Sequence, residues 1–84
     1  MTNTINPRNM LTAMTANKLN TWTTQGVAGL DQVIIDRVVK QLKSTLKMLE
    51  RGTKLRSNHH LILALLIDEV EDASTRKALF SYIA

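Results

Sequence analysis

An unbroken apolar run, Leu61 to Ile67, most constrains what this 84-residue chain can fold into. It lies within the stretch Asn58 to Val70 and has no polar face. A buried strand could hold so short a run, but leucine and alanine dominate it and valine is absent, which favours a helix. A helix that is apolar all round must be covered on every side. The rest of the chain therefore has to supply that cover.

The chain is short for this task. We expect a single helical domain over residues 1–84, with residues 1–5 disordered. A chain of this length buries only about 60–65% of its unfolded surface. No cysteine is present, which excludes disulfides and thiolate metal sites, and the neighbouring His59 and His60 would point about 100° apart on a helix. We predict no metal and no cofactor, so oligomerisation remains as the stabilising device.

The first half of the chain predicts two helices around a glycine-containing loop. Asn6 and Pro7 suit a helix start, and the residues from Arg8 to about Trp22 have helical apolar spacing, although many Thr and Asn residues weaken it. Gly26 and Gly29 then mark a connection. A Gly-x-x-Gly without a preceding strand or a following Lys-Ser/Thr is a weak phosphate-binding signal.

Residues 30–51 have the clearest helical pattern. At 100° per residue the apolar side chains share an arc of about 100°, and the basic side chains fall on the opposite side. The apolar stripe is Ile35, Val38, Val39, Leu42, Leu46 and Leu49, and the basic stripe is Arg37, Lys40, Lys43, Lys47 and Arg51. Gly52 is well placed to end this helix in the left-handed conformation.

The second half predicts one or two further helices. The short link Thr53 to Ser57 is typical of antiparallel neighbours, and Ser57 or Asn58 could cap a helix through the apolar run to about Asp72. A last helix from Thr75 to Tyr82 could follow, or residues 58–83 could form one long helix. The predicted fold class is all-α, a small bundle of three to four helices completed by homo-oligomerisation.

The need for cover predicts the interface between copies. Three thin elements around a helix that is apolar on all sides leave a gap, which a second copy would fill most simply about a two-fold axis. We therefore predict a homodimer or homotetramer. Its interface residues are Leu61, Ile62, Leu65 and Leu66.

Eleven basic and seven acidic residues give a net charge of +4, which is compatible with an acidic protein or a nucleic acid. The start of the chain lacks the pattern of a secretory signal, and a seven-residue apolar run is far short of the roughly 20 that span a bilayer, so we expect a cytoplasmic protein. Acidic residues cluster at 68–72, where Lys40 or Lys43 could approach them if the two helices pack antiparallel.

Partner binding is assigned to the basic stripe and to the aromatics Phe80 and Tyr82, since aromatic side chains are frequent interface anchors. A solvated face that only maintains solubility is the plain alternative for the stripe. No nucleophile or acid–base arrangement indicates an enzyme. We predict a small regulatory interaction protein that binds and modulates another macromolecule.

The size and class of the chain fit the accessory regulators of phages and plasmids, such as an antirepressor that inhibits a transcriptional repressor, although no residue motif carries this analogy. The alternative is a nucleic-acid-binding regulator that uses the basic face of residues 30–51. A structural subunit of a larger complex is a third hypothesis.

Overall fold

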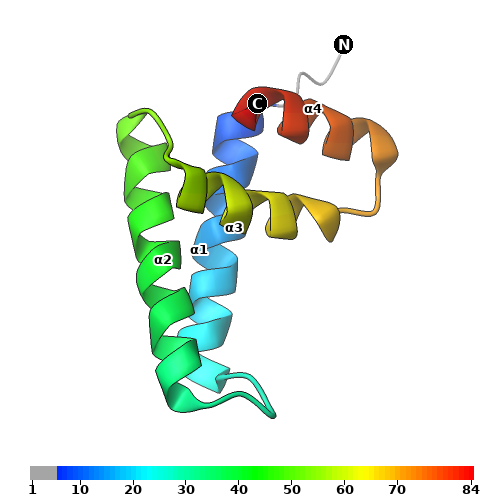
Figure 1. Cartoon of the computed structure of the whole chain (residues 1–84). Helices are drawn as coiled ribbons and strands as arrows, with labels where there is room; N and C mark the ends of the chain where they lie inside the picture. The colour runs from blue at the N-terminus through cyan, green and yellow to red at the C-terminus, as the bar shows by residue number, and fades with distance from the viewer. Residues whose placement is uncertain (1–5) are drawn as a thin grey trace.

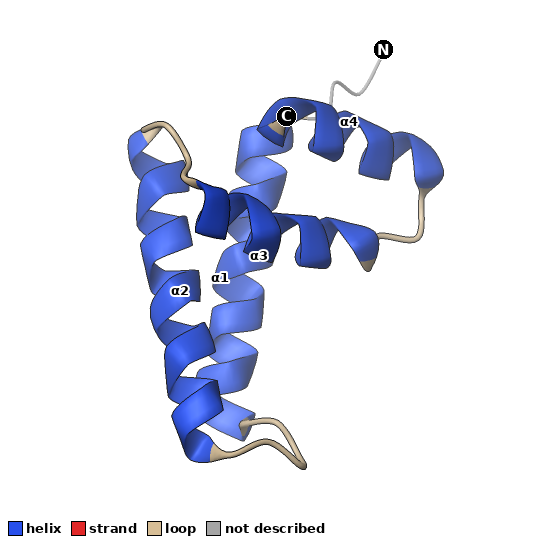
Figure 2. Ribbon diagram, viewed as in Figure 1, coloured by secondary structure: helices blue, strands red, loops and turns tan. Residues whose placement is uncertain are grey.

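The computed structural model describes residues 6–84, which form four helices and no strand (Figures 1 and 2). The helices are α1 (Pro7–Gln25), α2 (Gln32–Arg51), α3 (Ser57–Asp68) and α4 (Ala73–Ile83). The prediction of an all-α fold with three to four helices is confirmed. The expected disorder of residues 1–5 lies outside the described residues.

The helices are arranged as two pairs. Helices α1 and α2 run side by side as a long antiparallel hairpin, and the shorter pair α3 and α4 lies across one half of it (Figure 1). The short link after α2 is typical of antiparallel neighbours, but α3 turns away after it and runs across both long helices (Figure 1). The half of the hairpin nearest the connection between α1 and α2 is left without a third helix.

Helix α1 begins as predicted and ends later. The Asn6 side chain accepts the Asn9 N–H at 3.1 Å, and Pro7 occupies the first helical position. The helix continues three residues past Trp22 to Gln25. Its threonine hydroxyls donate to the carbonyls four residues earlier, as Thr15 does to Leu11 at 2.7 Å. This bonding satisfies hydroxyls that would otherwise compete with helical structure.

Two independent devices satisfy the last carbonyls of α2. Gly52 is left-handed, with φ 69° and ψ 21°, and its N–H and that of Thr53 donate to Leu49 and Met48. From α1, the Arg8 guanidinium adds hydrogen bonds of 2.8 Å to the carbonyls of Leu49 and Glu50. The first turn of α1 is thereby attached to the last turn of α2.

Helix α3 starts without the predicted cap from Ser57 or Asn58. The buried His59, 2% exposed, turns back so that its Nδ1 accepts the Arg56 N–H at 3.1 Å. Its Nε2 lies 3.0 Å from the Ser44 hydroxyl on α2. Because Nδ1 accepts, the ring proton belongs on Nε2 and is donated to Ser44. Burial, followed by the charges of Arg56 and His60, lowers the pKa of His59.

The choice between one helix and two is resolved as two. Helix α3 ends at Asp68, earlier than the predicted Asp72, and the chain reverses before α4 (Figure 1). The Asp72 carboxylate accepts the Thr75 N–H at 2.9 Å and the Thr75 hydroxyl at 2.6 Å, which starts α4 and lowers the Asp72 pKa.

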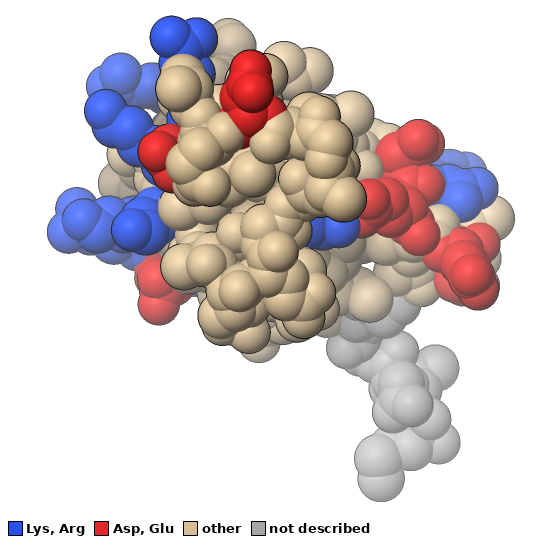
Figure 3. All heavy atoms as spheres, turned by 90° about the horizontal axis from the view of Figure 1, so that it is seen from below, with Lys and Arg blue, Asp and Glu red and all other residues tan. Residues whose placement is uncertain are grey.

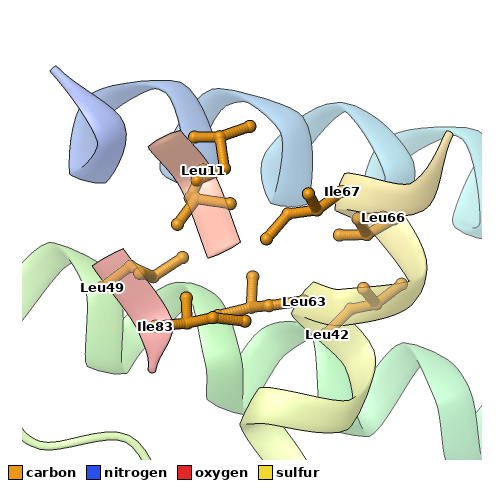
Figure 4. Packing of buried hydrophobic residues seen from close by; sticks show 8 residues of the cluster. Leu11, Leu42, Leu49, Leu63, Leu66, Ile67 and Ile83 are labelled. Atoms are coloured by element: carbon orange, nitrogen blue, oxygen red, sulfur yellow. The ribbon is translucent and has the colours of Figure 1, made fainter. Parts of the chain in front are cut away.

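The core lies where the α3–α4 pair meets the hairpin, and all four helices contribute to it (Figure 4). Within the apolar run, Leu63, Leu66 and Ile67 are buried. Leu61 and Leu65 are 65% and 64% exposed. The chain therefore covers one side of the run and leaves the other open. The remaining side chains of this cluster are Leu11, Leu42, Leu49, Leu79 and Ile83, and Ile35 of α2 is buried outside it.

Candidate interaction surfaces

A groove of about 580 Å³ lies between the α1–α2 hairpin and α3. Its walls are mainly apolar, with Trp22 from α1, Val38 from α2, and Ile62 and Leu65 from α3. It exists because α3 crosses the hairpin instead of lying along it. Between this crossing and the α1–α2 connection, the two long helices pack only against each other (Figure 1). We call this feature the α3 groove.

Helix α1 begins to line the α3 groove at Lys18. Successive inward positions of α1 are occupied by Leu11, Thr15, Lys18 and Trp22, so a cation stands where a core residue is expected. Its Nζ reaches the Glu69 carboxylate just after α3 at 2.9 Å. Within residues 6–84 this is the only ion pair, and the expected approach of Lys40 or Lys43 to the acidic cluster is not found.

Charge is divided between the two ends of the α3 groove. Arg37 lines it on the α2 side, whereas Asp68 and Glu69 line it at the far end of α3. Lys18 also lines the groove and is paired with Glu69, so Asp68 is the carboxylate there without an ion pair within residues 6–84. Viewed from the end of the hairpin that carries the α1–α2 connection, a broad surface of uncharged side chains lies between one side where cations predominate and another where carboxylates predominate, although each side also holds some charges of the opposite sign (Figure 3). Leu30, Val33 and Ile34, near this end of the hairpin, are also exposed.

The predicted oligomer-interface residues fall into two groups. Leu61 and Leu65 stand on the exposed side of α3, and Ile62 is half-buried in the α3 groove. Leu66 is only 6% exposed and belongs to the core of the single chain. It lines the floor of the α3 groove but has little surface left for a partner.

All five residues of the basic stripe are exposed on α2, but they do not border one site. Lys40, Lys43 and Lys47 surround a second hollow of about 490 Å³ on a different side of α2 from the α3 groove. Leu19 of α1 and Leu46 of α2 also line it. We call this feature the basic hollow. Arg37 lines the α3 groove instead, and Arg51 lies beyond the hollow at the end of the helix.

The predicted aromatic site is divided. Phe80 is 37% exposed and Tyr82 is 44% exposed. Residues two positions apart point about 200° apart around a helix, so these rings lie on opposite flanks of the buried stripe of Leu79 and Ile83. The two rings therefore do not form one continuous binding surface for a partner. The i, i+2 spacing of Phe80 and Tyr82 already predicts this separation on a helix.

Sequence reasoning missed the α3 groove. Trp22 was assigned to helical packing, and Lys18 was not considered, although a lysine within an apolar helical stripe is a readable sign that this part of the stripe meets solvent. In residues 6–84, no group of three or more His, Asp or Glu side chains is placed to hold a metal ion. None of the helices in this range has the length and hydropathy needed to cross a membrane.

Comparisons with protein-family models, with curated proteins and with solved structures found no match to this chain.

Proposed function

We propose that this chain is an interaction protein, which self-associates and modulates a second macromolecule by binding it, without catalysis. The observation that carries the proposal is the distribution of exposed apolar surface. The chain closes a core with one side of the Leu61–Ile67 run and leaves Leu61 and Leu65 about two-thirds exposed. Fully burying a leucine contributes roughly 1.5–3 kcal/mol, so leaving this surface in water forgoes stability that association would recover.

The basic hollow supports an acidic protein segment as the second partner. Lys40, Lys43 and Lys47 provide positive charge around a floor that includes Leu19 and Leu46. An amphipathic segment with carboxylates beside apolar side chains satisfies both parts of this surface. Glu50 at its border reduces the positive field without reversing it. The repressor-inhibitor hypothesis is one form of this proposal, in which the acidic segment belongs to a transcriptional regulator.

A nucleic acid is the second candidate partner, favoured by the exposed cations along α2. The basic hollow contains no aromatic side chain on which a base could stack, and Leu19 and Leu46 in its lining offer nothing to a phosphate. Binding to duplex DNA would appear as an affinity that falls steeply with salt, with a slope near −0.9 per contacted phosphate. Titration of a labelled duplex at low salt separates the two candidates.

The test of the basic hollow is quantitative capture from cells that encode the chain. The wild type is compared with Lys43→Gln/Lys47→Gln, and the matched control is Lys54→Gln/Lys77→Gln, which removes two exposed cations elsewhere. We expect the first double variant to lose a protein that the control retains. Equal retention by both variants, or a captured species that nuclease removes, would contradict an acidic protein partner.

A further inference from the structure

We propose that the α3 groove is occupied by a second copy of this chain, in a two-fold dimer whose α3 helices run antiparallel. This inference rests on the self-association in the proposed function and specifies its geometry.

The order of charges along the α3 groove fits an antiparallel helix. Helix α3 begins beside α2, which carries Arg37, and runs across the hairpin to Asp68 and Glu69 (Figure 1). Because Lys18 already pairs with Glu69, a helix that binds alongside α3 should present a carboxylate to Arg37 at one end and a cation to Asp68 at the other. An antiparallel α3 does this, because its own Asp68 ends it and its own exposed Arg56 precedes it. The two-fold axis then repeats each pairing.

The exposed leucines of α3 fit the same arrangement. Leu61 and Leu65 are one helical turn apart and stand about 6 Å from each other along α3. A two-fold axis near Leu63 places Leu61 opposite Leu65 of the second copy. In this register Leu65 can turn toward the apolar wall formed by Trp22 and Val38 of the other chain. Each copy thus places its Leu65 in the α3 groove of the other, with Leu61 packed beside it.

The pair to be tested is Arg37 with Asp68 of the second copy. Both side chains are exposed, and Glu69 already has Lys18 as its partner within the chain, so a change at Asp68 leaves that ion pair intact. Charge reversal at either position places like charges together at two symmetric points. Reversal at both positions restores attraction with the signs exchanged.

The experiment is sedimentation equilibrium of the full chain and its variants, with helical content checked by circular dichroism. The wild type should form a species of twice the 9.4 kDa chain mass. Arg37→Glu and Asp68→Lys should each raise the dimer Kd about tenfold or more, and the double variant should return to within about threefold of the wild type. Lys47→Glu, with the same charge change outside the α3 groove, should stay within about threefold of the wild type.

The only tryptophan of the chain reports on the site itself. Trp22 lines the α3 groove, so its fluorescence should shift to shorter wavelength as concentration drives dimerisation. A wild type that is monomeric at about 100 µM, a double variant no better than the single ones, or a dimer that leaves Trp22 emission unchanged would each overturn the proposal. Such a result would not affect the basic hollow, whose capture experiment uses different residues.

Discussion

His59 should make the stability of this protein fall in mild acid. Its ring is 2% exposed and is bonded as a neutral group, with Nδ1 accepting from Arg56 and Nε2 directed at Ser44. A proton added at Nδ1 would face the Arg56 N–H and break the start of α3. The native pKa is lowered, so in acid the unfolded chain binds a proton that the folded chain refuses.

The sign and the size of the effect follow from this difference. Since the unfolded state binds more protons, stability rises with pH and is lost as pH falls below the unfolded value of 6.5. If the native ring stays neutral, lowering the pH from about 7.5 to about 5.5 costs at most about 1.4 kcal/mol. The pKa of Asp72 is also lowered, but that carboxylate titrates below this pH range.

Urea unfolding followed by circular dichroism at several pH values measures the effect. A loss of about 1.4 kcal/mol moves the urea midpoint by roughly 0.5–1.4 M. The protein concentration is held fixed because the proposed dimerisation would add to stability. The control is His59→Asn, whose side-chain oxygen can accept the Arg56 N–H but does not titrate. Its pH dependence should be flatter between these pH values. A wild type without pH dependence, or a variant with an unchanged slope, would refute the reasoning.

Three further predictions concern packing and capping. Leu63→Ala, at a fully buried site, should lower the free energy of unfolding by about 2–5 kcal/mol, whereas Leu61→Ala should change it by no more than about 0.5 kcal/mol when urea unfolding is measured on dilute monomer. Arg8→Ala should lower the free energy of unfolding by about 1–3 kcal/mol in the same assay. Arg8→Lys should not restore this stability, since one ammonium cannot reproduce the two hydrogen bonds to the carbonyls of α2. Near-neutral values for both variants would contradict this role. Asp72→Ala should lower the melting temperature at neutral pH, and the difference from the wild type should vanish below about pH 3.8 as acid protonates the Asp72 carboxylate. A difference that persists in strong acid would point to another cause.

Features encoded by a few neighbouring residues could be predicted from the sequence. Asn6 and Pro7 start α1 and Gly52 ends α2, because each acts on backbone groups within a few residues of itself. The start of α3 was the exception. Histidine is not among the usual N-terminal capping residues, and the role of His59 depends on burial against α2.

The direction of α3 could not be predicted, and most of the candidate site depends on it. Link length and apolar periodicity do not determine how steeply one helix crosses another. The crossing leaves Leu65 open while it buries Leu66, and it brings Trp22 and Val38 to the same groove. The basic stripe was visible in the sequence because it lies on one helix. Its division between two surfaces was not visible, because that depends on what packs beside α2.

Partial cover by α3 and α4 also has a consequence for local opening. In the half of the hairpin that they cross, buried side chains tie all four helices together, whereas beyond Thr15 α1 has no fully buried residue. Native-state hydrogen exchange should therefore divide each long helix, with slow amides near Leu11 and Leu49 and fast amides near the connecting loop. The α3 groove includes Trp22 from the fast part, so a chain that binds there would slow exchange at a distance from its own contacts.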